Sequence, residues 1–168
     1  MKKEKVKLDE IDVFVFDFDG VLTNNKVYLD KSGKEFVSCS RSDGLAFDVL
    51  RLLKKPCFIL STETNPVVRA RANKLKVKCF QGVKNKLTGL KEIIQKLNFD
   101  RKRVFFVGND INDYHVMEFC GFSACPQDSH KKIKDIATFK CKTKGGEGVL
   151  QEILESIFEI DFLEVLYK

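Results

Sequence analysis

The sequence predicts an α/β protein built on a parallel sheet with helices on both faces. Two observations support this fold class. Short, almost wholly apolar runs, as at residues 11–16, where only Asp12 is polar, and 104–107, alternate along the chain with segments of helical periodicity. Strands without polar alternation are buried on both faces, which is typical of parallel sheets. The chain has 168 residues, of which 43% are hydrophobic, and it is expected to form one domain, residues 1–168.

The first part of the chain predicts a strand, a hairpin and a helix. The apolar run at residues 11–16 is the first strand. A hairpin insertion is expected at about residues 24–40, because two β-type runs flank a polar turn in which Gly33 can adopt a positive φ angle. The helix predicted at residues 45–53 ends before Pro56.

The rest of the chain continues the alternation of strands and helices. Residues 57–60 form a second apolar run, and Asn65 followed by Pro66 indicates the N-cap and first position of a helix. A later helix starts near Asp113, and Gly121 is expected to end it with a left-handed cap. The other predicted elements are a helix at 87–97, strands at 104–107 and 122–124, and a helix at 149–158.

Composition and charge exclude several classes of protein. The net charge of +6 favours anionic partners, but the lysines are dispersed without interleaved aromatic residues, so no nucleic-acid partner is expected. No apolar run approaches the ~20 residues of a membrane span, and the N-terminus lacks the apolar core of a signal peptide. The six cysteines occur singly, which predicts a reducing, cytoplasmic location. The densest lysine groups are Lys2, Lys3, Lys5 and Lys7, and Lys131, Lys132 and Lys134.

Two carboxylates, Asp17 and Asp19, directly follow the first predicted strand. Like charges held so close raise each other's pKa unless a cation intervenes. Mg²⁺ prefers such hard oxygen ligands and shares them with a substrate phosphate. Gly20 permits the sharp turn that this arrangement needs. A solvated turn with two aspartates is the alternative interpretation of this motif taken alone.

A second polar loop strengthens the case for a metal and phosphate site. The strand at residues 104–107 leads into Asn109, Asp110 and Asp113, which offer further oxygen ligands. In parallel sheets, ligands bind at the carboxyl ends of the strands, where both loops lie. Between the loops in sequence stand Ser61 and Lys86, a hydroxyl donor and a cation of the kind that phosphoryl transfer uses.

These residues, in this order, resemble the haloacid dehalogenase superfamily of phosphatases, which has a Rossmann-like fold. The resemblance implies that Asp17 is the nucleophile, and that Asp19 is first the general acid and then the base. It implies that Ser61 and Lys86 position the phosphoryl group. It also implies that Mg²⁺ is held by Asp17, Asp19 and the loop residues Asn109, Asp110 and Asp113.

The chain departs from the family pattern at one position. The second acidic loop of the family usually begins Gly-Asp, whereas here Asn109 follows the glycine. An amide oxygen can bind Mg²⁺ but carries no negative charge, so either Asn109 is a neutral ligand or Asp110 replaces it. This difference supports an alternative hypothesis of another class, a non-catalytic phosphatase-like domain kept for oligomerisation or binding.

The segment between Thr23 and Ser61 holds only the hairpin and one helix, so the hairpin stands in place of a cap domain. The chain thus resembles the capless subgroup that includes 3-deoxy-D-manno-octulosonate 8-phosphate phosphatase and nonulosonate 9-phosphate phosphatases. That resemblance implies a homotetramer, joined through the hairpin, and a sugar phosphate substrate.

Residues after Ser61 favour a nonulosonate 9-phosphate, of the sialic acid type, over the octulosonate 8-phosphate. The pattern of Glu63, Arg71 and Lys74 is similar to that of the nine-carbon branch, in which these residues contact the sugar acid. Two cations suit a carboxylate-bearing substrate. Thr62 and Asp43 are further candidates for substrate contact. The alternative for Arg71 and Lys74 is a surface helix with solvated charges.

Overall fold

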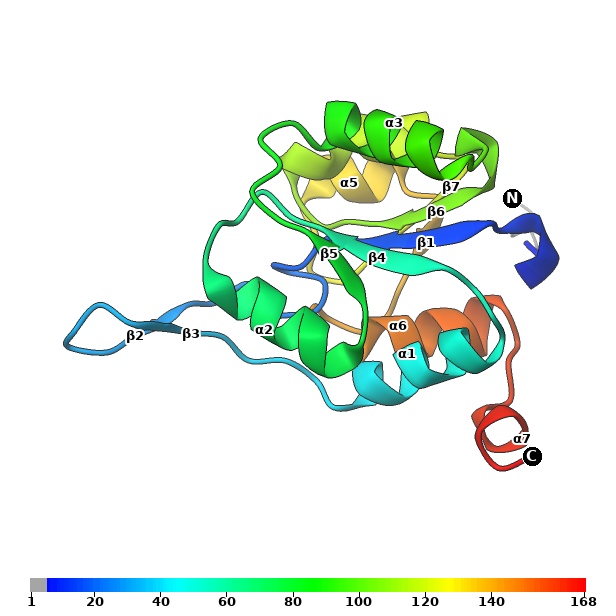
Figure 1. Ribbon diagram of the computed structural model, residues 1–168, viewed down its shortest axis with the longest axis horizontal. Coiled ribbons are helices and arrows are strands. Elements are labelled where there is room, and N and C mark those ends of the chain that lie inside the picture. The colour runs from blue at the N-terminus through cyan, green and yellow to red at the C-terminus, as the bar shows by residue number, and fades with distance from the viewer. Residues whose placement is uncertain (1–5) are drawn as a thin grey trace.

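A six-stranded parallel sheet forms the centre of the computed structural model, which describes residues 6–168 (Figure 1). The strand order is β5-β4-β1-β6-β7-β8. The α/β fold predicted from the apolar runs is therefore confirmed. Of the basic N-terminal group, Lys2, Lys3 and Lys5 lie outside the described residues. The strands are β1 (Val13–Phe16), β4 (Cys57–Leu60), β5 (Lys78–Phe80), β6 (Val104–Val107), β7 (Phe122–Cys125) and β8 (Phe139–Lys140).

Helices cover both faces of this sheet, as Figure 1 shows. One face packs against α1 (Ser42–Leu52), α2 (Pro66–Leu75), α6 (Val149–Glu152) and α7 (Phe162–Leu166). The other packs against α3 (Lys86–Leu97), α4 (Tyr114–Phe119) and α5 (Lys131–Ile136). Strand β1 supplies both cores, because Phe14 and Phe16 point to one face while Val13 and Val15 point to the other.

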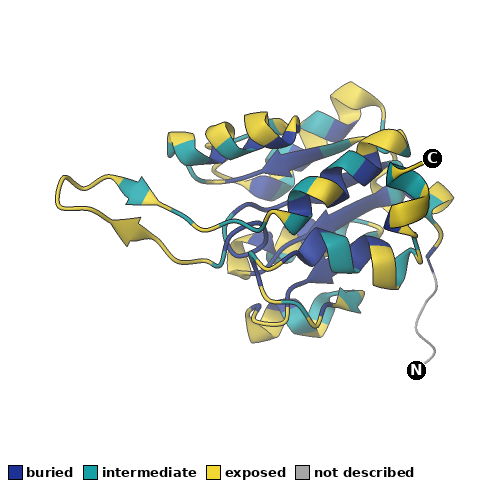
Figure 2. Cartoon of the chain, turned by 90° about the horizontal axis from the view of Figure 1, so that it is seen from below, coloured by how far each residue is buried: buried dark blue, intermediate teal, exposed yellow. Residues whose placement is uncertain are grey.

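A hairpin, β2 (Tyr28–Leu29) and β3 (Glu35–Phe36), projects from the body of the protein (Figures 1 and 2). It forms a separate two-stranded antiparallel sheet whose turn has Gly33 at φ 80°. The β-type runs that the sequence predicts on either side of the turn cover residues 27–29 and 35–38. Both strands are shorter than these runs, because the hairpin has no packed face to extend them. Its large apolar side chains are largely exposed: Val27, Tyr28, Leu29 and Phe36.

Several elements differ from the sequence predictions. The first long helix begins at Ser42 rather than at residue 45, and residues 149–158 pass from α6 into a π-helical turn at Ile153–Ile157. Gly121 has no left-handed φ angle; a Cβ there would lie 1.8 Å from the Lys102 carbonyl oxygen, so close backbone packing requires this glycine. The elements that the sequence did not predict are β5, β8, α5, α7 and the 3₁₀ turns Leu8–Glu10, Arg101–Arg103 and Ile111–Asp113.

The C-terminal segment packs on its own chain. Helix α7 lies against α1, and Phe162 is buried in the same core as Phe14. None of the helices in the described part of the chain is both long and apolar enough to span a membrane. All six cysteines are free thiols.

Candidate active site

The two acidic loops meet at the carboxyl ends of β1 and β6. These strands are adjacent and parallel, with Phe16 paired to Val107, so the residues that follow them lie side by side. The Asp17 amide continues the pairing by donating to the Val107 carbonyl oxygen at 2.9 Å. A cavity of about 330 Å³ opens here, lined by Asp17, Asp19, Asn25, Ser61, Thr62, Asn109, Asp110, Ile111 and Asn112.

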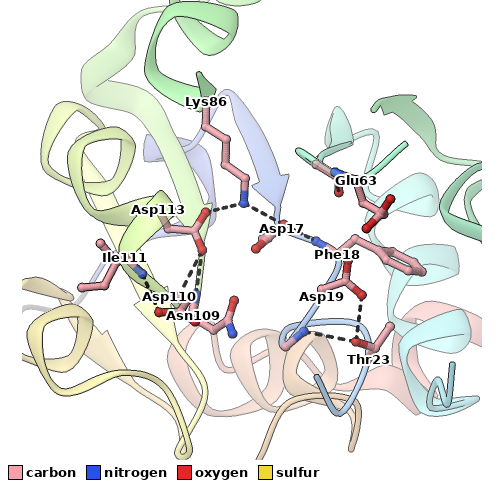
Figure 3. A network of polar contacts seen from close by, with 12 residues as sticks. Asp17, Phe18, Asp19, Thr23, Glu63, Lys86, Asn109, Asp110, Ile111 and Asp113 are labelled. Carbon is pink, nitrogen blue, oxygen red and sulfur yellow. Dashed lines mark hydrogen bonds and ion pairs between the residues drawn. The ribbon is translucent and has the colours of Figure 1, made fainter. Parts of the chain in front are cut away.

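Lys86 connects the two loops, because it contacts both Asp17, which lines this cavity, and Asp113 (Figure 3). Its Nζ lies 2.8 Å from Asp17 Oδ1 and 2.7 Å from Asp113 Oδ1. All three residues are buried, so each charge depends on the others for compensation. Lys86 is the first residue of α3, and the Asn85 side chain caps this helix by accepting a hydrogen bond from the Thr88 amide.

Burial perturbs the ionisation of both aspartates of the first loop. Burial raises the pKa of Asp17 well above its usual value, and the nearby Asp113 charge adds to this, while Lys86 opposes it. The pKa of Asp19 is also raised, first by burial and then by the negative charge of Glu63. Asp19 Oδ1 accepts a hydrogen bond from the Thr23 hydroxyl at 3.4 Å. Asp19 is therefore suited to carry a proton that it can donate.

The Asn109 side chain brings a third polar group to the carboxylates. One terminal atom of its amide lies 3.3 Å from Asp17 Oδ2 and 2.8 Å from the Asp19 carbonyl oxygen. With nitrogen in that position, the amide donates to both oxygens. With oxygen there, three oxygens converge on one point, which is the donor set that a hard cation prefers. Among residues 6–168 no cluster of three His, Cys, Asp or Glu side chains suits a metal, so this mixed set is the candidate.

Gly20 makes the close approach of Asn109 possible. Its φ angle is 81°, and a Cβ at this position would lie 1.9 Å from Asn109 Nδ2. A glycine-rich segment at residues 145–148 packs behind the same turn, because the Gly146 amide donates to the Val21 carbonyl oxygen at 3.0 Å. A Cβ on Gly145 would lie 2.1 Å from the Gly20 carbonyl oxygen. Both close contacts therefore require glycine.

The other two predicted metal ligands have different surroundings. Asp113 is fully buried. Its Oδ2 accepts a hydrogen bond from the backbone N–H of Asn109 at 2.9 Å, while its Oδ1 faces Lys86. Asp110 lines the cavity, and its Oδ1 accepts from the Ile111 amide at 2.7 Å. Asp113 thus holds the loop and Lys86 in place, while Asp110 can turn an oxygen towards the cavity.

Ser61 directly follows β4 and lines the cavity together with Asp17 and Thr62. Its buried hydroxyl accepts a hydrogen bond from the Glu63 amide at 3.1 Å, which leaves the hydroxyl proton available to a ligand. The Glu63 carboxylate accepts from the Thr64 and Asn65 amides at 2.6 and 2.8 Å. Figure 3 shows the Glu63 side chain close to that of Asp19.

The remaining predicted substrate contacts lie elsewhere. Arg71 and Lys74 line a second cavity of about 730 Å³ between α1 and α2, and this cavity shares no lining residue with the first. The Arg71 guanidinium donates to the Ser40 carbonyl oxygen at 2.7 Å. Asp43 is buried; its Oδ1 accepts from the Leu150 amide, and its Oδ2 has no partner. None of these three residues is among those that line the Asp17 cavity.

Asp43 gives a prediction for stability against pH. Burial raises the pKa of Asp43 to about 6, so the folded protein binds its proton more tightly than the unfolded chain does. The free energy of unfolding should then fall as pH rises through about 4 to 6, and the penalty should be complete above that range. Relative to the wild type, Asp43→Asn should therefore raise the free energy of unfolding by about 2 kcal/mol more at pH 8 than at pH 4.5. Denaturant titrations at both pH values measure this difference, and an equal effect at both would contradict it.

Sequence reasoning missed three residues that line the Asp17 cavity, namely Asn25, Ile111 and Asn112. Asn25 has φ 58°, a left-handed conformation that asparagine tolerates, and Asn112 belongs to the polar loop already identified. The sequence signal that could have identified Asn25 and Asn112 was therefore their closeness to the Asp17 and Asn109 loops. No sequence signal marked Ile111, an apolar residue in a polar loop.

The chain is similar to known proteins in sequence and in fold. A family model for haloacid dehalogenase-like hydrolases matches residues 68–153. The 3-deoxy-D-manno-octulosonate 8-phosphate phosphatase KdsC of Escherichia coli K12 is 27% identical over 150 residues, covering 89% of this chain and 80% of that protein.

Two solved structures extend the comparison. One, described as a HAD family hydrolase from Streptomyces avermitilis, is 36% identical with a TM-score of 0.90, covering 94% of this chain and 90% of that one. The other is the octulosonate phosphatase of Moraxella catarrhalis in complex with magnesium, phosphate and KDO. It is 24% identical with a TM-score of 0.85 and covers 89% of this chain and 87% of that one, a likeness in fold.

Proposed function

Because the chain belongs to the haloacid dehalogenase-like hydrolases, we propose that it is a Mg²⁺-dependent phosphomonoesterase that acts through an aspartyl-phosphate on Asp17. The observation that carries this proposal is the buried ion pairing of Lys86 with Asp17 and Asp113, in which Asp17 also lines a polar cavity. A carboxylate held in one orientation beside a fixed cation is arranged for nucleophilic attack on phosphorus. We further propose that residues 1–168 act as a single phosphatase domain in the cytoplasm.

The residues around Asn109 fit Mg²⁺. Asp17 Oδ2, the Asp19 carbonyl and the Asn109 amide oxygen would hold the ion, and Asp110 borders the same space. When bound, Mg²⁺ withdraws negative charge from the phosphoryl oxygens. We place Asp113 behind these ligands, where it orients Lys86 and accepts a hydrogen bond from the backbone N–H of Asn109.

The proposed reaction has two steps that use the same pair of aspartates. In the first, an Asp17 oxygen bonds to phosphorus as the phosphorus–oxygen bond of the ester breaks, and Asp19 gives its proton to the leaving oxygen. In the second, the Asp19 carboxylate takes a proton from water while the water oxygen attacks phosphorus, which releases phosphate and the Asp17 carboxylate. The Ser61 hydroxyl and Lys86 stabilise the equatorial oxygens in both steps.

For the substrate we propose an acidic sugar phosphate, most specifically a nonulosonate 9-phosphate. Glu63 lies near Asp19, where it can accept sugar hydroxyl groups. Arg71 and Lys74 line a separate cavity, and in the proposed homotetramer they would contact this substrate from a second copy of the chain. The exposed apolar hairpin supports the proposed homotetramer, since an isolated two-stranded hairpin is marginally stable in water. The octulosonate 8-phosphate is the second candidate, favoured by the named activity of the E. coli relative.

Phosphate release with Mg²⁺ tests the function directly, using nonulosonate 9-phosphates, the octulosonate 8-phosphate, simple sugar phosphates and an aryl phosphate. Release from a nine-carbon acid in preference to the others is the expected result. Preference for the eight-carbon acid would retain the mechanism and overturn the nonulosonate assignment. No release from any compound by folded protein in saturating Mg²⁺ would favour the non-catalytic alternative.

Arg71→Ala tests the carboxylate contact. We expect the KM for the acidic sugar phosphate to rise about tenfold or more, because a charge-assisted hydrogen bond is lost, while the KM for an aryl phosphate stays the same. Arg69→Ala is the matched control, since Arg69 is exposed on the same helix and does not line the α1–α2 cavity. Equal effects of Arg71→Ala on both substrates would contradict a role in binding the carboxylate.

A further inference from the structure

A third recess lies next to the Asp17 cavity, which is the proposed catalytic cavity. The α4–α5 groove, defined by Ile111, Tyr114, His115, Lys132, Asp135 and Ile136, has a volume of about 580 Å³. Ile111 borders both spaces, and Figure 3 shows its side chain directed away from Asp17. A ligand that leaves the catalytic cavity across Ile111 therefore enters this groove.

The catalytic cavity is too small to enclose a large sugar phosphate. Its volume of about 330 Å³ is at the lower end of the range of small-molecule sites, ~300–1,000 Å³, and it must also hold the phosphoryl group and the ion. The part of the substrate remote from the phosphate must then lie outside it. The α4–α5 groove offers adjoining space within the same subunit.

The groove combines an apolar wall with one donor and one acceptor. Ile111 is 47% exposed, and Tyr114 and Ile136 are half-buried, so the wall presents accessible apolar surface. Lys132 and Asp135 lie three residues apart on α5, on one side of the helix. Within residues 6–168 neither is in an ion pair, so both charges are open to a ligand.

We propose that the α4–α5 groove binds an acylamino substituent of the substrate. This inference rests on the proposed function and adds to it the chemical class of the sugar. The methyl group of an acyl chain would pack on Ile111 and Ile136, the Lys132 ammonium would donate to the amide carbonyl, and the Asp135 carboxylate would accept from the amide N–H. A sugar with a hydroxyl at that position lacks the methyl group and the carbonyl.

Kinetics with a matched pair of substrates tests the proposal. The pair is an N-acetylated nonulosonate 9-phosphate and the deaminated analogue with a hydroxyl in place of the acetamido group. We expect wild-type kcat/KM to favour the N-acetylated compound about tenfold or more, and Lys132→Ser and Ile136→Ala each to reduce this ratio. Lys131→Ser is the control, because Lys131 is exposed on α5 outside the groove and should leave the ratio unchanged. A wild-type ratio near one, or variants that keep the ratio, would overturn the proposal.

A binding measurement separates the groove from the catalytic function. Free N-acetylneuraminate, added to isotope-labelled protein with inorganic phosphate, should shift the backbone amide signals of residues 114–116 and 131–136, which do not line the catalytic cavity, in an NMR spectrum. Lys132→Ser should weaken this response, and the deaminated sugar acid should give a smaller one. These shifts without phosphate release from any substrate would retain the groove and reject the proposed function. Shifts confined to the residues of the catalytic cavity would reject the groove.

Discussion

Asp17→Asn is expected to reduce phosphate release by more than about 1,000-fold while the thermal midpoint stays unchanged or rises. An amide cannot form the aspartyl-phosphate, so the proposed first step is lost. Stability should not fall, because Asp17 and Asp113 are two buried carboxylates that share one cation. With asparagine at position 17, Lys86 keeps Asp113 as its partner, and one buried negative charge is removed.

Activity assays and thermal unfolding of the same preparation check this expectation. Asp9→Asn is the control, since Asp9 is an exposed carboxylate in the Leu8–Glu10 turn and lines neither the catalytic cavity nor the α1–α2 cavity. Retention of more than a few per cent of activity by the Asp17 variant would exclude Asp17 as the nucleophile. A large fall in its thermal midpoint would show that the pair with Lys86 is needed for folding as well.

Lys86→Met is expected to damage both activity and stability. The substitution leaves Asp17 and Asp113 buried without a cation, which should lower the free energy of unfolding by about 3–5 kcal/mol. Catalysis should also be lost, because the fixed charge near the phosphoryl oxygens disappears. Denaturant unfolding and phosphate release measure the two effects separately.

The double variant Lys86→Met with Asp17→Asn distinguishes charge imbalance from lost packing. It should recover part of the lost stability, because one of the two uncompensated carboxylates has been removed, but it should recover no activity. Lys84→Met is the matched control, since Lys84 is an exposed lysine in the same loop. A double variant less stable than Lys86→Met alone would contradict the electrostatic explanation.

The strands that carry the site could be predicted because each is an uninterrupted apolar run. Strands β1, β4 and β6 lie inside the sheet, where both faces are covered, and so they need no polar residue. The missed strands β5 and β8 are the two edges of the sheet. They are short and include Lys78 and Lys140, both exposed, so they lack a periodic signal.

The residues of the candidate site also divide into those that the sequence could place and those that it could not. Asp17, Asp19, Ser61 and Asn109 could be identified because each stands at the end of an apolar run, and parallel pairing brings such ends together. Arg71 and Lys74 were predicted as substrate contacts from a pattern within one helix, and this stays a prediction. That pattern places residues on a helix face but does not set which cavity the face lines, and α2 turns them towards α1.

The sequence by itself determined which apolar runs form the inner strands and which polar residues follow each of them. It also determined the chemistry that those residues can perform. Tertiary structure alone decided how these residues are partnered. It placed Lys86 between Asp17 and Asp113, set the Asn109 amide against the Asp19 carbonyl, and packed Gly145 behind Gly20. The physical reason is that periodicity is a local property of the chain, whereas ion pairing and close backbone contact depend on distances between segments far apart in sequence.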